Sequence, residues 1–341
     1  MHSQPSTNAS PGMHDDATRP GPAGRAHPDD LAGDRSAFTI AVLPDTQKYA
    51  KSHPHHFERQ TQWIAENAER CNIRHVVHLG DVTNNNTEPE WVVAERSMSQ
   101  LDGIVPYAMV AGNHDYHDKP IRRSNSQLSS YFPVSRLARL SSFGGVMEVG
   151  SIENSFHTFE ANGMRVLIIA IEYGPRDEVV QWANDIVRQH SDHLAILVTH
   201  AYLYFDAQRY DWANHGSEQR WSPHASALIE EGSVNDGEEL WQKLVRPNPQ
   251  FCLTLNGHVL GPGVARRCDA GEAGNLVHQL LVNYQMLEEG GSGYLRLLTF
   301  RPDQSVIESR TYSPSLDRTS ISRGNAFTLP LTPAPRESPV E

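Results

Sequence analysis

Side chains that bind divalent metals follow several short apolar segments of this chain. They are Asp45 and Gln47, Asp81, Asn113 with His114 and Asp115 beside it, His200 and His258. Carboxylate oxygens, amide oxygens and imidazole nitrogens suit Mn, Fe, Zn or Mg, whereas soft-metal sites use thiolates. Two such ions roughly 3.5–4 Å apart can hold a hydroxide for in-line attack on phosphorus, and one aspartate can bridge them. The residue types therefore fit a two-metal centre for displacement at phosphorus.

Strands and helices alternate along the chain and must position these side chains. The patterns predict strands at 38–43, 74–79, 105–110, 155–160, 164–171, 194–199 and 251–255, and helices near 56–70, 89–101 and 177–189. Asn162-Gly163 predicts a hairpin, and 277–282, 294–300 and 306–312 read as an antiparallel set. In open α/β sheets, loops at the carboxyl ends of strands converge on one crevice. The metal-type residues follow such strand ends.

The order of the motifs resembles a known family. Gly80-Asp81, Gly112-Asn113-His114-Asp115, His200 and Gly257-His258 resemble, in this order, the motifs of the calcineurin-like metallophosphoesterases over about residues 38–312. The most specific part of this resemblance is the Gly-Asn-His-Asp sequence after an apolar strand. The resemblance implies an α/β fold, a two-sheet sandwich flanked by helices in four layers, α/β/β/α.

The resemblance also implies roles for single residues. Asp45 would bind the first metal, Asp81 would bridge both, and Asn113, His200 and His258 would bind the second. His114 would contact the substrate phosphate and protonate the leaving oxygen. Asp115 would orient the imidazole of His114.

Two departures from the family pattern affect the first metal. The usual Asp-x-His is here Asp45-Thr46-Gln47, and the usual Gly-His-x-His ends in Leu260. Glutamine offers only a neutral carbonyl oxygen and leucine offers no ligand atom. The first site is therefore expected to bind its metal more weakly than usual and to prefer a hard cation. His78 and Asn84 are the nearest replacement ligands in sequence. The Pro-Asp-Thr-Gln variant resembles a subgroup of the family, which favours a modified site over a dead one.

Each motif also has an ordinary structural explanation. Gly112-Asn113-His114-Asp115 could be a simple turn, and Asp45 and Asp81 could cap helices. The histidines at 53, 55 and 56 could form a solvated loop or a third metal site. These explanations weaken when the motifs are taken together.

The ends of the chain and one internal segment differ in composition from the rest. Residues 1–36 and 329–341 are predicted to be disordered tails around a catalytic domain at 37–328. The segment 201–236 is long and rich in aromatic residues, so it could be a lid that stacks on a base or sugar of the substrate. The alternative is a satellite hydrophobic cluster that holds the loop down.

Composition excludes several classes of protein. Lysine plus arginine number 29 against 41 aspartate plus glutamate, and the net charge of −12 argues against broad nucleic-acid binding. No apolar run approaches the roughly 20 residues of a membrane span. Cys71, Cys252 and Cys268 are too scattered for a disulfide framework. No secretory signal is visible, so the expected location is the cytoplasm.

The predicted function is therefore a metal-dependent phosphoesterase. It would hydrolyse a phosphomono- or phosphodiester of a small molecule, such as a nucleotide or sugar phosphate, through a metal-activated hydroxide and a histidine general acid. The depleted first site leaves two alternatives open. One is a metal-containing protein that binds phosphate ligands with weak or lost hydrolysis, and the other is a different hydrolysis or transfer.

Overall fold

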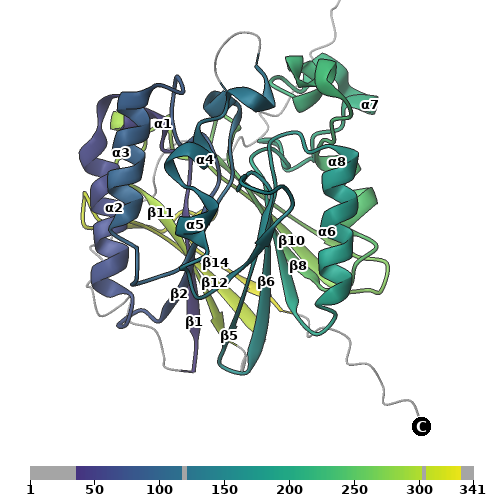
Figure 1. Cartoon of the computed structure of the whole chain (residues 1–341). Coiled ribbons are helices and arrows are strands. Elements are labelled where there is room, and N and C mark those ends of the chain that lie inside the picture. Colours follow the sequence, from purple (N-terminus) through teal and green to yellow (C-terminus); the bar gives the residue numbers. More distant parts are fainter. Residues whose placement is uncertain (1–35, 117–120, 302–304, 332–341) are drawn as a thin grey trace, which may run out of the picture.

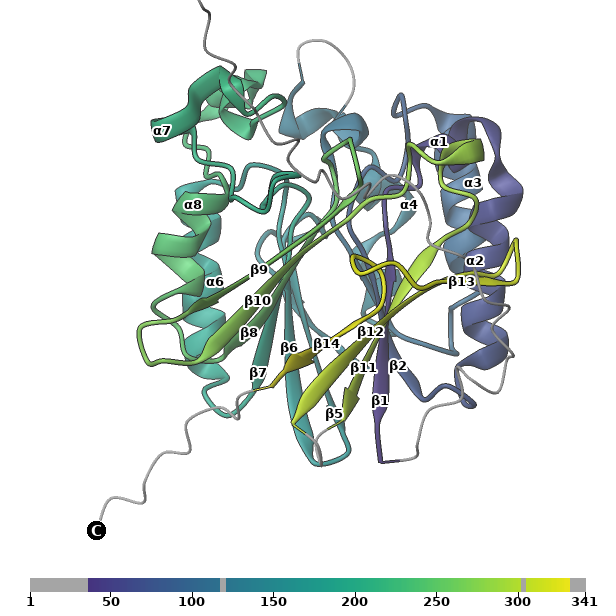
Figure 2. The ribbon, with the colours of Figure 1, turned by 180° about the vertical axis from the view of Figure 1, so that it is seen from behind.

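Two β-sheets lie face to face in the centre of the molecule, with helices on both outer faces (Figures 1 and 2). The computed structural model describes residues 36–116, 121–301 and 305–331. The predicted N-terminal tail lies outside these residues, apart from Ser36. The layers follow the order helix, sheet, sheet, helix, which confirms the predicted α/β/β/α architecture.

The first sheet places parallel strands beside antiparallel ones. Its order is β13 (Arg318–Ser320), β12 (Val306–Ser313), β11 (Leu295–Arg301), β1 (Phe38–Leu43), β2 (Ile73–His78) and β3 (Tyr107–Met109), and β14 (Phe327–Pro330) also pairs with β12. Strands β1, β2 and β3 are parallel, and β11 runs antiparallel to β1. The loops after β1, β2 and β3 therefore leave the sheet at one edge.

The second sheet contains four parallel strands in its middle. Its order is β4 (Phe143–Val146), β5 (Ser155–Ala161), β6 (Met164–Ala170), β7 (Leu194–Val198), β8 (Phe251–Asn256), β10 (Leu276–Val282) and β9 (Val264–Ala270). Strands β6, β7, β8 and β10 are parallel. The predicted hairpin joins β5 to β6, and Asn162 and Gly163 both have positive φ, as a type I′ turn requires.

Helices cover the outer face of each sheet (Figure 1). The α-helices are α1 (Gln47–Ser52), α2 (Pro54–Asn67), α3 (Glu88–Ser99), α4 (Leu128–Tyr131), α5 (Val134–Leu137), α6 (Asp177–Gln189), α7 (Trp212–His215) and α8 (Gly237–Leu240), which continues as a π-turn (Trp241–Val245). Short 3-10 helices span Asn113–Tyr116, Arg123–Asn125, Gly216–Glu218, Pro223–Ala225, Ala227–Glu231 and Glu288–Gly290. Helices α1 to α3 lie on the first sheet, and α6 and α8 lie on the second.

Alternating side chains of buried strands build two separate cores. Ile40 and Val42 of β1 point between the sheets and belong to the same apolar cluster as Ile168 of β6. Their neighbours Ala41 and Leu43 belong to the cluster that includes the helix side chains. Because both faces of the strands are buried, the strands read as continuous apolar runs in the sequence.

Two sequence predictions need correction. Strand β10 (predicted at 277–282) does not join β11 and β12, but lies in the other sheet, parallel to β8. Apolar periodicity identifies a strand without naming its partner. Strand β9 and helix α1 were not predicted. The C-terminal tail does not begin at Leu329, because Leu329 pairs with Ile307 in the first sheet; residues 332–341 lie outside the described part.

No helix among the described residues combines the length and apolar character needed to cross a lipid bilayer.

Candidate metal centre

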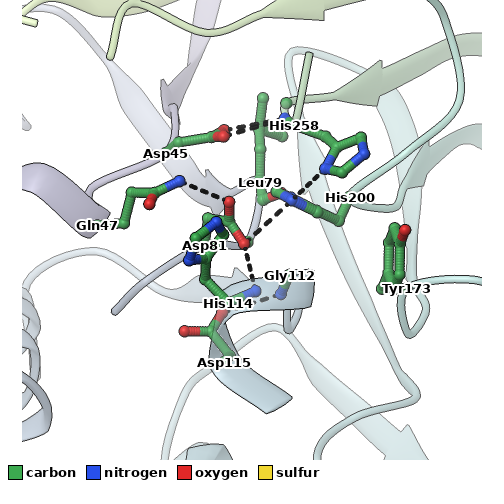
Figure 3. A network of polar contacts seen from close by, with 12 residues as sticks. Asp45, Gln47, Leu79, Asp81, Gly112, His114, Asp115, Tyr173, His200 and His258 are labelled. Carbon is green, nitrogen blue, oxygen red and sulfur yellow. Dashed lines mark hydrogen bonds and ion pairs between the residues drawn. The ribbon is translucent and has the colours of Figure 1, made fainter. Parts of the chain in front are cut away.

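Five strand ends deliver the candidate ligands to one region between the sheets. Asp45 follows β1, Asp81 follows β2, Asn113 follows β3, His200 follows β7 and His258 follows β8. Figure 3 shows Asp45, Asp81, His200 and His258 converging, with Gln47 and His114 beside them. Side chains from both sheets meet there because the parallel strands of each sheet end at the same edge of the sandwich.

Asp81 is the centre of this group. Its carboxylate is almost fully buried, with Oδ1 3.2 Å from His200 Nε2. The backbone N–H of His114 donates to Oδ1 over 2.9 Å, and Gln47 Nε2 donates to Oδ2 over 2.7 Å (Figure 3). A buried carboxylate is costly unless it is paired with positive charge or coordinates a metal.

Each imidazole of the site donates one ring N–H to a backbone carbonyl. His200 Nδ1 lies 2.7 Å from the oxygen of Leu79, and His258 Nε2 lies 2.9 Å from that of Trp221. A carbonyl can only accept, so these nitrogens carry the protons. The opposite nitrogens, His200 Nε2 and His258 Nδ1, face each other at 3.2 Å and are directed at the centre. This is the arrangement that orients histidine ligands in metal sites.

The side chains of Asp81, Asn113, His200 and His258 fit a divalent cation. The ligand atoms of Asp81, His200 and His258 lie within 4.8 Å of one another, and all three residues are buried. Asn113 Oδ1 is buried, and no described group donates a hydrogen bond to it. Unpartnered buried oxygens are rare. Imidazole nitrogen with carboxylate and amide oxygen suits Zn, Mn or Fe.

The surroundings of Asp45 fit a metal less well. Its carboxylate accepts hydrogen bonds from the backbone N–H of His258 (3.0 Å), Asn283 Nδ2 (2.9 Å) and Gln285 Nε2 (3.2 Å). The backbone N–H of Gln285 donates to Asn283 Oδ1, which fixes the amide of Asn283 with its nitrogen toward Asp45. Neutral N–H donors thus take up the carboxylate oxygens of Asp45. This agrees with the absence of the two histidines that the family pattern places at the first metal.

The two predicted replacement ligands have other partners. His78 Nδ1 accepts from the N–H of Gly80, and His78 Nε2 lies 3.0 Å from Thr46 Oγ1, so both its nitrogens are used. The side-chain amide of Asn84 donates to Asn85 Oδ1, and the backbone carbonyl of Asn84 accepts from His114 Nδ1. Both residues thus shape the loops around the site through contacts with neighbouring residues.

Burial and charge act on the titratable groups of the site. Burial lowers the pKa of His200, but Asp81 and Asp45 outweigh it and raise this pKa to about 9. Burial lowers the pKa of His258 to about 3. Burial raises the pKa of Asp45, whereas for Asp81 the histidines, His200 foremost, outweigh burial and lower it. The centre therefore keeps Asp81 charged and His258 neutral, whereas His200 must release the proton of Nε2 to the solvent before it can bind a cation.

The motif glycines are explained by close approach to the site. A Cβ atom on Gly112 would overlap Asp81, and one on Gly257 would overlap Oδ1 of Asp45. Asp81 and His258 themselves have left-handed backbones, with φ of 48° and 72°. Such conformations cost energy and gather at functional sites. The glycines of the Gly-Asn-His-Asp and Gly-His motifs thus let Asp81 and Asp45 lie against the backbone of the neighbouring loop.

Asp115 does not orient His114, contrary to the sequence prediction. Its carboxylate accepts from the backbone N–H groups of Val82, Thr83 and Gly112 and from the hydroxyl of Thr83, over 2.8 to 3.0 Å. Asp115 thus joins the loop after β2 to the loop after β3. The carbonyl of Asn84 holds His114 instead, because His114 Nδ1 lies 2.7 Å from it.

A pocket of about 160 Å³ opens onto this centre. It is lined by Gln47, Lys48, Asp81, Asn113, His114, Trp221, His258, Leu260, Gln285 and Met286. The sequence analysis missed Lys48, Asn283 and Gln285 as site residues. Asn283 and Gln285 directly follow β10, so they carry the same strand-end signal as the predicted ligands. Trp221 belongs to the aromatic segment 201–236, whose composition predicted rings near the substrate without saying which ring reaches the site.

The aromatic segment 201–236 divides into two parts. Tyr202, Tyr204 and Tyr210 are buried and belong to the main apolar cluster, which confirms the packing explanation for them. Trp221 lines the pocket and is 41% exposed, and its carbonyl binds His258. The three tyrosines are therefore packed in the core, and the ring of Trp221 faces the site.

Comparison with known proteins agrees with this geometry. The family model of the calcineurin-like phosphoesterases matches residues 38–262. The chain is 32% identical over 327 residues to "Uncharacterized protein YvnB" of Bacillus subtilis (strain 168), covering 92% of this chain and 23% of that protein, so it spans under a quarter of that relative.

Solved structures resemble the chain as well. The purple acid phosphatase PPD1 of yellow lupin (Lupinus luteus) seeds shares the fold, with a TM-score of 0.52 at 15% identity, covering 86% of this chain and 54% of that one. A 5'-nucleotidase precursor of Thermus thermophilus aligns with a TM-score of 0.45 at 15% identity, covering 87% and 55%. With the family match over most of the described residues and the motifs placed around one centre, the chain belongs to the calcineurin-like phosphoesterase family.

Proposed function

We propose that this protein is a metal-dependent hydrolase of small phosphate esters. The observation that carries the proposal is the convergence of Asp81, His200 and His258 at one buried point, with Asn113 in the same pocket and its Oδ1 lacking a partner among the described residues. These four residues would hold the cation. When bound, a divalent ion lowers the pKa of water and stabilises negative charge on a phosphoryl group.

Two further side chains of the pocket complete the proposed site. His114 has its Nδ1 proton on the carbonyl of Asn84, which leaves Nε2 for the substrate. We assign His114 as the group that gives a proton to the leaving oxygen. Lys48 lines the same pocket and supplies a fixed positive charge for the phosphate.

We expect one tight metal position and a weaker one. A second ion beside Asp45 must displace the amide N–H groups of Asn283 and Gln285 from its carboxylate. At the Asp81 position, Asn113 Oδ1 accepts no hydrogen bond from a described residue, so an ion that binds this oxygen displaces no donor from it. The metal content of this centre should therefore fall toward one ion on dialysis, with further uptake beside Asp45 at higher metal concentration.

The test is hydrolysis by the full chain after removal of metal. The protein is treated with a chelator, supplied with Mn²⁺, Zn²⁺, Fe²⁺ or Mg²⁺ singly, and assayed on p-nitrophenyl phosphate and bis(p-nitrophenyl) phosphate. We expect chelation to abolish turnover and at least one ion to restore it. Tight metal binding without hydrolysis of either ester would contradict the proposal and favour a protein that only binds phosphate ligands.

The rim of the pocket indicates the class of leaving group. Trp221, Leu260 and Met286 line the pocket, and Trp221 and Met286 are 41% and 60% exposed. Leu260 stands where the family pattern has a metal-binding histidine, so an apolar wall replaces a ligand. We propose that the substrate carries a flat ring, such as a nucleobase or aryl group, which stacks on Trp221.

Replacing Trp221 with alanine should weaken binding of ring-bearing esters. A base stacked on an aromatic side chain is worth about 1–3 kcal/mol, so KM should rise about 5- to 150-fold for nucleoside or naphthyl phosphates. Phenylalanine should restore most of the loss, and KM for glycerol phosphate should change little. Phe205→Ala is the matched control, because Phe205 is similarly exposed in the same segment and does not line the pocket. An equal rise in KM for both kinds of ester would contradict stacking.

A further inference from the structure

A second group of ligand-type side chains lies apart from the candidate centre. His55 and His56 in the first turn of α2 face Glu289 in the loop after β10. His56 Nε2 lies 2.7 Å from Glu289 Oε2, and His55 Nε2 lies 3.7 Å from the same oxygen. Two imidazoles therefore converge on one carboxylate oxygen.

The ring of His56 is held in place from behind. Its side chain is only 4% exposed, and Nδ1 lies 2.8 Å from the hydroxyl of Ser315. Because Ser315 occupies Nδ1, the other nitrogen is directed at Glu289. A hydrogen bond to the far nitrogen is the usual way in which proteins orient a histidine ligand and fix its tautomer.

Glu289 is placed by an unusual stretch of backbone. It has φ 50° and ψ 30°, and all four residues from 290 to 293 also have positive φ. This stretch is fixed to helix α1, because the N–H of Gly293 donates to the hydroxyl of Tyr49 over 3.0 Å. A left-handed glutamate is strained, and strain of this kind accompanies ligand sites more often than ordinary loops.

We propose that His55, His56 and Glu289 form a second cation site, which takes a borderline divalent ion such as Zn²⁺. Two imidazole nitrogens and one carboxylate oxygen form a common zinc ligand set, and they disfavour Mg²⁺, which prefers oxygen alone. The side chains of His55 and Glu289 are 63% and 49% exposed, so an ion can enter and water can complete its coordination. The site shares no residue with the candidate metal centre.

An ion at this second site would act on the pocket through the loop. The same loop carries Gln285, which donates a hydrogen bond to Asp45, and Met286, which lines the pocket. The ion would join the start of α2 to this loop and fix the rim of the pocket. Its role is thus structural, and it supplies no group to hydrolysis.

Zinc binding by the full chain tests the proposal. Zn²⁺ per chain and its affinity are measured by isothermal titration calorimetry with elemental analysis, for the natural protein and for His55→Ala and Glu289→Gln. Both side chains are exposed, so the variants should fold, which circular dichroism without zinc checks. We expect each variant to lose one equivalent of bound zinc and to keep the equivalent that depends on Asp81.

Two further variants make the result specific. Ser315→Ala should keep the stoichiometry but weaken this equivalent about 10- to 100-fold, as loss of a partner behind a histidine ligand does. His215→Ala is the control, because His215 belongs to none of the ligand groups found in the described part of the chain, and it should change nothing. The proposal fails if His55→Ala and Glu289→Gln bind as much zinc, with the same affinity, as the natural protein.

Discussion

Replacing Asp81 with asparagine should cost the protein its tight metal ion and lower kcat/KM for phosphate esters by about 1,000-fold or more. Charge stabilisation by a catalytic metal is worth several kcal/mol, and each ~1.4 kcal/mol is a factor of ten. Asp81 is the buried carboxylate that contacts His200 directly and that Gln47 and the backbone of His114 hold in place. Elemental analysis and initial rates on p-nitrophenyl phosphate measure both effects.

Asparagine keeps the shape of the side chain, so the loss would report charge and not misfolding. The matched control is Asp185→Asn on α6, where the carboxylate is half-exposed and contacts Arg188 and Gln181 at the surface. Exposed pairs of this kind contribute little. Asp185→Asn should keep metal and activity. If Asp81→Asn retained both as well, the assignment of this centre would be wrong.

The candidate ligands could be proposed from the sequence because strand ends are locally encoded. Buried strands read as apolar runs, and the residues that follow them enter loops at a common edge. Asp45, Asp81, Asn113, His200 and His258 could therefore be proposed one by one from local patterns. Their convergence depends on two sheets packing face to face, which no local pattern contains and which the family resemblance supplied.

The sequence prediction of the sheets was wrong where it depended on which strand pairs with which. The strand at 277–282 was predicted, but pairing with the strands that follow it was wrong, since it lies beside β8. Had β10 been placed parallel to β8, Asn283 and Gln285 would have appeared at the same edge as His258. The amide donors on Asp45 were therefore missed through topology, although their residue types were visible.

The role of Asp115 shows a second limit of sequence reasoning. Adjacency to His114 favoured a pair in which the carboxylate orients the ring. In the structure the 3-10 turn Asn113–Tyr116 directs the Asp115 carboxylate inward, onto the N–H groups of Val82, Thr83 and Gly112. Neighbours in sequence point in different directions on a helical turn. For Trp221 the composition of 201–236 predicted aromatic rings near the substrate, but it did not say which residue of the segment contacts His258.

Replacing His114 with alanine should slow hydrolysis most for esters with poor leaving groups. A positioned general acid contributes about 100- to 10,000-fold when the leaving oxygen needs a proton. An alkyl alkoxide needs that proton, whereas p-nitrophenolate leaves readily without it. The loss in kcat/KM should therefore fall from about 1,000-fold for alkyl phosphates toward about 10-fold for p-nitrophenyl phosphate.

The leaving-group dependence separates this role from a simple contact with the phosphate. His114 is not among the residues whose ligand atoms gather at the centre, so His114→Ala should keep its metal. A plot of log kcat/KM against the pKa of the leaving alcohol should be steeper for the variant than for the natural protein. Parallel plots, with equal losses on all esters, would assign His114 to phosphate binding alone and leave the proton donor to another group of the pocket.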